Sequence, residues 1–175
     1  MRVTGLGHAG LFIETKGGTV LCDPWVKPAF FGSWFVFPDN RGLDWKKYGN
    51  ADYLYISHRH RDHFDPWLLN EYVPKDIKVL LPEYPTDDLE TDLRSLGFTN
   101  IIYTRAGEVI EDNGLRNAEL RTYLAAWITE CALHGDLDAG DHIAVDFVDG
   151  AFTFATTKRE LAAVEAGPSA ASAAD

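Results

Sequence analysis

The sequence is poor in cysteine, in basic residues and in long apolar runs, and each shortage excludes a class of protein. Its two cysteines, Cys22 and Cys131, stand far apart along the 175 residues. Disulfide-stabilised domains and Cys-x-x-Cys metal knuckles need cysteines that are more numerous or more closely spaced. We therefore expect both cysteines to be ordinary thiols.

Basic residues are outnumbered, with 16 Lys and Arg against 27 Asp and Glu and a formal net charge of −11. Nucleic acids and anionic lipids require clustered Lys and Arg, so we expect neither a nucleic acid nor a membrane as partner. No apolar run reaches the roughly 18 residues that a membrane-spanning helix needs, and the N-terminus lacks a basic stretch followed by an apolar one. These features predict a cytoplasmic protein and leave a homo-oligomer open.

Charge and aromatic content change along the chain, which indicates two regions. Residues 1–110 carry 15 acidic and 12 basic side chains, residues 111–175 carry 12 and 4, and four of the five Trp precede residue 70. Because large aromatic side chains contribute most to a core, the first region is the better folding unit. We predict a domain over residues 1–112, an extension over 113–161 and a disordered tail over 162–175, whose small residues cannot offset the entropy of ordering.

The first region opens with a predicted hairpin and a long loop. Residues 9–13 and 19–22 are typical of short strands, and the glycines at 17 and 18 suit the tight turn between them. Residues 23–48 are rich in Pro, Gly and aromatic side chains and show neither a helical nor a strand period. They predict a long loop of the kind that often serves as a functional lid.

Strands and helices alternate after this loop. Asp65-Pro66 is an N-cap followed by proline at the first helical position, and Gly97 is typical of a helix end. The pattern predicts strands over 52–56, 78–81 and 100–103 and helices over 65–72 and 87–96. An α/β layered fold follows from this alternation.

The second region predicts a helix and a hairpin. Apolar residues recur at close to a helical period over 117–133. Asp149-Gly150 is a strong hairpin signal between two runs of strand character, 142–148 and 151–157.

The run His58-Arg-His-Arg-Asp62-His63 brings three imidazoles and a carboxylate together within six residues. These groups are ligands for Zn²⁺ and similar ions. His58 and His60 can share a side because alternate residues leaving a strand share a face, while Asp62 and His63 follow the bend. The spacing predicts His58, His60, Asp62 and His63 as metal ligands, in two pairs that suit two adjacent ions. The alternative is a polar surface loop in which the histidines occur by chance. In such a loop the positive charges of Arg59 and Arg61 would have no functional reason.

The run resembles the H-x-H-x-D-H signature of metallo-β-lactamase-fold hydrolases, which follows a buried strand. The segments 7–10 (Gly-His-Ala-Gly) and 21–24 (Leu-Cys-Asp-Pro) resemble the opening of the branch that contains L-ascorbate-6-phosphate lactonase-like and N-acylphosphatidylethanolamine phospholipase D-like proteins. The aromatic segment 25–45 and the run 57–66 are closer still to bacterial proteins related to the metallo-β-lactamase-like domain of CMP-N-acetylneuraminate hydroxylase, which often carry a Rieske iron-sulfur domain. The resemblance covers residues 1–110.

The resemblance implies an αββα half of that fold, a mixed sheet with flanking helices, followed here by the C-terminal helix and hairpin. It also implies that His58 and His60 hold a first metal ion and that Asp62 and His63 hold a second, with zinc, iron or manganese as candidate ions. Metal-activated water would attack an ester, amide, lactone or phosphodiester, and Asp62 would be catalytic by guiding the proton of that water.

His8 and Asp23 would line or orient the site. The alternatives are a core histidine bonded to backbone for His8 and an Asp-Pro turn residue for Asp23.

Beyond residue 110 the chain departs from that family. The second half of the complete fold supplies two further His and a bridging Asp, whereas here only His134 and His142 remain, each a candidate ligand or simply a turn or strand-start residue. A Rieske site needs both a Cys-x-His and a Cys-x-x-His pair, and the Cys-x-His pair is absent. Residues 124–154 instead resemble the C-terminal end of Clp-type AAA+ unfoldases without a Walker motif, which suggests a truncated or rearranged gene product.

Three functions stay open at this point. The first is a metal-dependent hydrolase of a small-molecule substrate. The second is a catalytically idle metal-binding half-domain that acts by assembling with another chain. The third is an accessory domain of a Rieske-type oxidoreductase, whose partner would supply the iron-sulfur centre.

Overall fold

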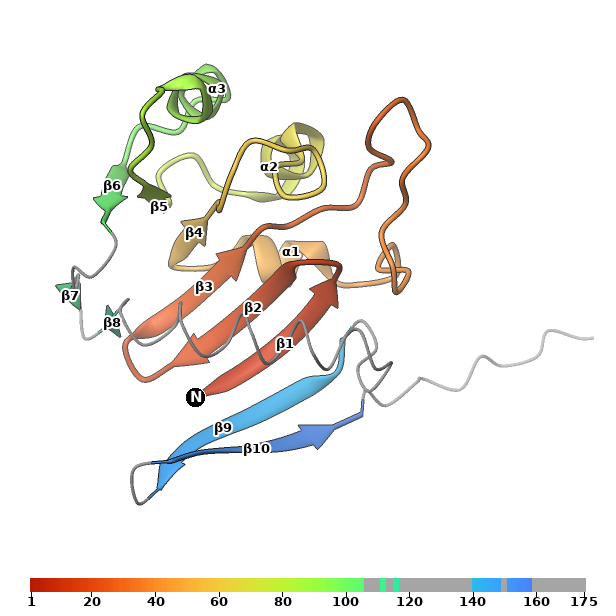
Figure 1. The fold of residues 1–175 in the computed structure, drawn as a ribbon, viewed down its shortest axis with the longest axis vertical. Coiled ribbons are helices and arrows are strands. Elements are labelled where there is room, and N and C mark those ends of the chain that lie inside the picture. Colours follow the sequence, from red (N-terminus) through yellow and green to blue (C-terminus); the bar gives the residue numbers. More distant parts are fainter. Residues whose placement is uncertain (106–110, 113–114, 117–139, 149–150, 159–175) are drawn as a thin grey trace, which may run out of the picture.

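A mixed β-sheet with helices packed on one face forms the framework of the protein (Figure 1). The computed structural model describes residues 1–105, 111–112, 115–116, 140–148 and 151–158. The main sheet has eight strands in the order β10-β9-β1-β2-β3-β4-β5-β6, and β7 (Glu111–Asp112) pairs with β8 (Leu115–Arg116). The bounds of the eight strands are β1 Arg2–Gly7, β2 Gly10–Thr15, β3 Gly18–Cys22, β4 Tyr53–Tyr55, β5 Lys78–Pro82, β6 Ile101–Thr104, β9 His142–Val148 and β10 Ala151–Thr157. The predicted α/β class is therefore confirmed.

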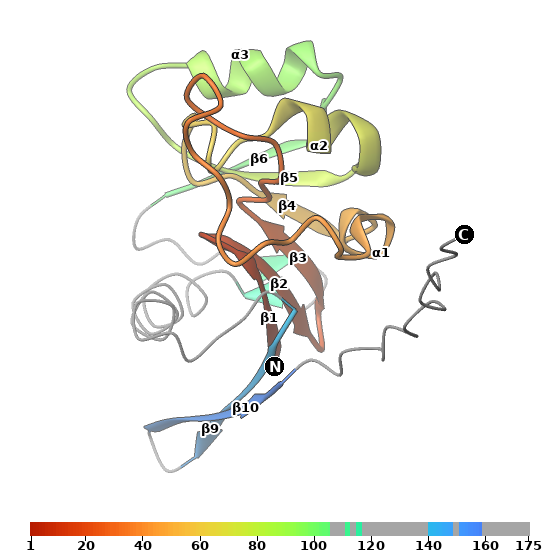
Figure 2. The ribbon, with the colours of Figure 1, turned by 90° about the vertical axis from the view of Figure 1, so that its right-hand side faces the viewer.

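The sheet is antiparallel from β10 to β3 and parallel from β3 to β6. Antiparallel neighbours can be joined by tight turns, whereas parallel neighbours need a crossover. The three crossovers contain α1 (Trp45–Gly49), α2 (Pro66–Tyr72) and α3 (Asp88–Ser95), which lie on the same face of the sheet (Figures 1 and 2). No helix in these described ranges combines the length and apolar character needed to cross a bilayer.

The strands place apolar side chains on both faces of the sheet. Leu54 and Val79 point to the helices and belong to the larger core cluster, while their neighbours Tyr53 and Leu80 belong to a second cluster. This division follows from the two-residue period of a strand. Helix residues Leu68, Leu69, Leu89 and Leu93 complete the larger cluster, and all four are buried.

Most of the predicted elements of the first region are present, with bounds shifted by one or two residues. β1, α1 and the short pair β7 and β8 were not predicted. β1 contains Gly5 and Gly7, which lower strand propensity, and it is held by pairing with both β2 and β9. α1 begins inside the segment predicted as loop and ends one residue beyond it, and its five residues are too few to show a helical period.

The predicted C-terminal hairpin is also present as β9 and β10, and β9 pairs with β1. The hairpin of the proposed extension thus shares a sheet with the first region, and the division at residue 112 stays a prediction. The predicted helix over 117–133, the tail over 162–175 and Cys131 lie outside the described residues. Cys22 is a free thiol at the end of β3.

Asp65 joins α2 to the long segment between β3 and α1. One carboxylate oxygen accepts hydrogen bonds from the backbone N–H groups of Trp67 and Leu68 at 3.1 and 3.2 Å, which caps the helix. The other accepts from the N–H groups of Val26 and Lys27 at 3.0 and 2.8 Å. Because Asp65 is buried, these four hydrogen bonds offset the cost of removing the carboxylate and the N–H groups from water.

We expect Asp65→Ala to lower the free energy of unfolding by about 2–4 kcal/mol, because it removes a cap and leaves buried N–H groups without an acceptor. Asp44→Ala is the matched control, since Asp44 caps α1 through one hydrogen bond at an exposed position, and a loss of about 0.5–1 kcal/mol is expected there. Urea unfolding followed by circular dichroism measures both. Equal losses in the two variants would show that Asp65 is no more than a helix cap.

Candidate functional site

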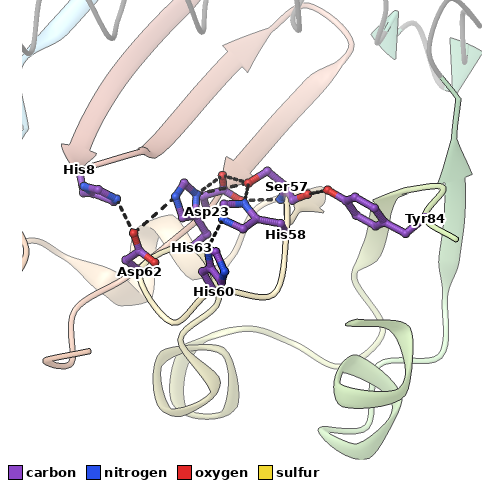
Figure 3. A network of polar contacts seen from close by, with 8 residues as sticks. All are labelled: His8, Asp23, Ser57, His58, His60, Asp62, His63 and Tyr84. Carbon is purple, nitrogen blue, oxygen red and sulfur yellow. Dashed lines mark hydrogen bonds and ion pairs between the residues drawn. The ribbon is translucent and has the colours of Figure 1, made fainter. Parts of the chain in front are cut away.

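Three strand ends meet at one edge of the sheet and carry the polar side chains of the site (Figure 3). His8 follows β1, Asp23 follows β3, and the run from Ser57 to His63 follows β4. β1, β3 and β4 run in the same direction, so their carboxyl ends lie at the same edge. This edge is where open α/β sheets bind ligands.

The backbone is unusual at two of these strand ends. His8 has φ of 51° and Asp23 has φ of 40°, a left-handed conformation that few residues other than glycine adopt. Gly7, at φ of 93°, precedes His8, and a Cβ there would lie 2.9 Å from the carbonyl oxygen of Pro38. The N–H of His8 donates to the carbonyl of Phe37 at 2.9 Å. Strained conformations of this kind persist where the surrounding structure holds them and are frequent at functional sites.

His8, Asp62 and His63 form the group best placed to hold a cation. Their ligand atoms all lie within 4.8 Å of one another. His8 Nε2 is 2.9 Å from Asp62 Oδ2, and His63 Nε2 is 3.7 Å from the same oxygen. The sequence placed Asp62 and His63 among the ligands and His8 beside them, whereas here His8 is a member of the group.

The Asp62 carboxylate favours a bound ion at this point. Asp62 is buried, and its Oδ1 has no hydrogen-bond partner among the described residues. A buried carboxylate oxygen without a donor is costly unless a cation or water completes it. Imidazole and carboxylate together are a donor set that zinc, iron and manganese accept. The residues present therefore fit a divalent metal ion.

His58 and His60 lie next to this group and face one another. His58 Nε2 is 3.1 Å from His60 Nδ1, and the His58 ring lies on the His63 ring at a centroid distance of 4.0 Å. Burial lowers the pKa of His58, and repulsion from His63 and His60 lowers it further. The neutral imidazole that this favours is the form that binds metals.

Asp23 orients His63 and the start of the histidine run. Its Oδ2 lies 2.9 Å from His63 Nδ1 and accepts from the Ser57 hydroxyl at 2.5 Å, while Oδ1 accepts from the Ser57 N–H at 2.6 Å. With His63 Nδ1 donating to Asp23, His63 Nε2 is left facing Asp62. Carboxylates commonly fix metal-binding histidines in this way.

Ser57 and Tyr84 take part in the same network, although the sequence reasoning singled out neither of them. The Ser57 hydroxyl lies 2.9 Å from His58 Nδ1, and the Tyr84 hydroxyl donates to the Ser57 carbonyl. Tyr84 follows β5, whose end shares this sheet edge. The position of each residue just after a strand was the available signal.

The two remaining histidines of the sequence are His134 and His142. His142 lies in β9 with its Nδ1 2.7 Å from the hydroxyl of Thr4, so its ring is engaged outside the group at Asp62. His134 lies outside the described residues.

We expect His63→Ala and Asp62→Ala each to weaken zinc binding by more than ~100-fold. Loss of a residue that only supports a metal ligand costs up to about 100-fold, so a larger loss identifies a ligand. Competition with a chromogenic chelator measures the affinity, and circular dichroism checks the fold. His142→Ala is the matched control and should bind zinc as the unaltered protein does. Unchanged affinity in the His63 and Asp62 variants would rule out this group as the metal site.

We expect Asp23→Asn to weaken zinc binding by about 10–100-fold, because the amide cannot hold His63 as a carboxylate does. Asn tolerates the left-handed backbone at position 23, so the fold should be retained. Asp44→Asn, at an exposed helix cap, serves as the control in the same competition assay. An Asp23→Asn protein with native affinity would contradict the orienting role.

Comparison with known proteins adds to this geometry. Residues 2–127 match the sequence model of the beta-lactamase superfamily domain. A Rieske 2Fe-2S iron-sulfur protein of Mycolicibacterium smegmatis is 59% identical over 104 residues, which cover 59% of this chain and 20% of that protein. A protein of the same description from Mycobacterium tuberculosis is 56% identical over 104 residues, with the same coverage. The chain thus matches about one fifth of the length of these relatives.

Two crystal structures share the fold at low sequence identity. A possible metal-dependent hydrolase from Veillonella parvula superposes with a TM-score of 0.52 and 20% identity, over 82% of this chain and 57% of that chain. An isothiocyanate hydrolase from Delia radicum gut bacteria superposes with a TM-score of 0.50 and 19% identity, over 87% and 58%. These likenesses concern the fold. Because the family model covers most of its length, the chain belongs to the beta-lactamase superfamily.

Proposed function

We propose that this chain carries the metal site of a hydrolase and that His8, Asp62 and His63 hold a divalent ion there, with His58 and His60 available to bind it or a second ion. Zinc is the ion we favour, and iron or manganese would suit the same ligands. The observation that carries the proposal is the buried Asp62 Oδ1, which lacks a hydrogen-bond donor among the described residues while two imidazoles face the same carboxylate.

When bound at such a site, a divalent ion polarises a substrate oxygen and lowers the pKa of water towards about 7. The protein's own groups would do the rest. Asp62 Oδ2 faces His8 and His63, and its Oδ1 has no donor among the described residues, so the carboxylate could bind the ion through one oxygen and accept a proton from water through the other. Asp23 would keep His63 in one tautomer by accepting a hydrogen bond from its Nδ1–H. The reaction we infer is the hydrolysis of an ester, lactone or phosphodiester in a small molecule.

The family and its fold neighbours support this class of reaction. The chain belongs to the beta-lactamase superfamily, and the two solved structures compared above are described as a possible metal-dependent hydrolase and an isothiocyanate hydrolase. A cytoplasmic location and a homo-oligomeric state stay predictions from the sequence.

A second candidate function rests on the Rieske-named relatives. Their identity to this chain, 56–59% over 104 residues, is much higher than that of the hydrolases. In this alternative the chain is a metal-binding domain that assembles with an oxidoreductase or acts without turnover. Because the chain contains no Cys-x-His pair, which a Rieske site needs beside a Cys-x-x-His pair, the iron-sulfur centre would come from elsewhere.

Turnover by protein loaded with zinc separates the two candidates. We expect hydrolysis of bis(4-nitrophenyl) phosphate or of an aryl ester or lactone, loss of that activity on dialysis against a chelator, and its return when zinc is restored. Asp62→Asn should lower kcat by about 10²–10⁴-fold, the usual contribution of a positioned acid or base, on top of weaker metal binding.

Asp39→Asn is the control, since Asp39 is exposed and pairs with Arg41 on the surface. Tight zinc binding without turnover of any of these substrates would favour the oxidoreductase-associated domain. Turnover that survives metal removal would overturn the proposed hydrolase.

A further inference from the structure

An exposed aromatic segment lies beside the candidate metal site. We name residues 29–37 the aromatic arm, a part of the long connection between β3 and α1 that projects on the helical side of the sheet (Figures 1 and 2). Five of its side chains are exposed: Phe30, Phe31, Trp34, Phe35 and Phe37. Phe35 and Phe37 retain 69% and 82% of their accessible surface. Contiguous apolar surface of this kind usually marks a binding site.

The arm has a defined backbone. Ala29 and Trp34 form an antiparallel bridge with two hydrogen bonds of 3.0 and 3.2 Å, and the Ser33 hydroxyl donates to the Phe30 carbonyl at 2.6 Å. Phe30 and Phe31 both have positive φ, 48° and 60°. Bulky residues rarely adopt this conformation, so the turn that presents the two rings depends on the Ala29–Trp34 bridge and the Ser33 hydrogen bond rather than on local preference.

Both ends of the arm contact residues of the candidate metal site. At one end the Phe30 ring lies 6.4 Å from the His60 ring, centroid to centroid, and Trp34 packs edge-on against Phe30 at 4.9 Å. At the other end the Phe37 carbonyl accepts from the N–H of His8. A substrate group leaving the site on the side of His60 therefore meets Phe30 and Trp34 first.

The chemistry of the arm limits what it can recognise. Residues 29–37 contain no charged side chain. Their polar side-chain groups are the Ser33 hydroxyl, which is already bonded within the turn, and the indole N–H of Trp34. The arm therefore offers mainly ring faces and edges and no charged group to pair with a phosphate or a carboxylate. The ligand group that buries most of this surface is an apolar one.

We propose that the aromatic arm binds an apolar acyl or aryl group of the substrate, next to the bond that is cleaved at the metal site. This inference rests on the proposed hydrolase and names its substrate class. Phe30 and Trp34 determine specificity by contacting the apolar group, and Phe31 and Phe35 extend the surface for longer groups.

The test compares the binding of octanoate and acetate to the zinc-loaded protein by isothermal titration calorimetry. Both probes carry the same carboxylate, and only octanoate has a chain that can reach the arm. We expect octanoate to bind at least about tenfold more tightly, since each buried methylene adds to the affinity. A parallel series of 4-nitrophenyl acetate and octanoate should show the same preference in kcat/KM.

Two variants remove rings from the arm with little disturbance of its backbone. Phe30→Asn keeps a residue that tolerates positive φ, and Trp34→Ala keeps the bridge to Ala29. Each should reduce the octanoate preference to less than about threefold while leaving acetate affinity unchanged. Tyr103→Ala is the matched control, because Tyr103 is a half-exposed aromatic residue on β6, outside the arm, and should keep the full preference.

Equal affinity for octanoate and acetate in the unaltered protein overturns the proposal, as does a preference that survives in both arm variants. A dimer lost in the arm variants, or binding to phosphatidylcholine vesicles that requires the arm, with no octanoate preference, would assign the arm to self-association or to a lipid surface instead. The proposed hydrolase fails separately, by the absence of any metal-dependent turnover. The comparison within the unaltered protein decides the matter even where an arm variant does not fold.

Discussion

The Asp23 carboxylate is the contact on which the site depends, because it ties the end of β3 to the loop that follows β4. Its own N–H donates to the carbonyl of Tyr55, and its two oxygens hold Ser57 and His63. A carboxylate that is buried among such donors is stable only while all of them are in place. The histidine run is thereby fixed relative to the sheet by the protein's own hydrogen bonds.

A second buried carboxylate gives the site its chemical character. Asp62 faces His8 from the end of β1 and His63 from its own loop, and it keeps one oxygen without a donor among the described residues. Asp23 and Asp62 thus play different parts, one saturated with hydrogen bonds and the other incomplete. By this difference we propose Asp23 as an orienting group and Asp62 as a ligand.

The family model places the chain in its superfamily, whereas the relatives do not define its reaction. The Rieske-named proteins are more similar in sequence, yet this chain spans about a fifth of their length, and the hydrolases share the fold at about 20% identity. In the proposed hydrolase the aromatic arm would bear most directly on substrate choice, because it combines exposed rings with a backbone contact to His8 and a ring contact to His60. Metal binding and specificity would then come from adjacent parts of one edge of the sheet.

The sequence by itself determined the local features of this protein. Three features depend only on residues that are close together in the sequence, so their periods and spacings could be recognised. They are the alternation of strands and helices from β2 to β6, the Asp65-Pro66 start of α2 and the dense histidine run. β1 was not predicted because its glycines lower strand propensity, and α1 was not predicted because it is too short to show a helical period. Pairing with β2 and β9 stabilises β1 in place of local propensity. Only the tertiary structure decided that His8 meets Asp62, 54 residues further along, and that His63 meets Asp23, 40 residues before it. Such meetings depend on the carboxyl ends of three parallel strands converging at one sheet edge, a long-range arrangement that no local spacing encodes.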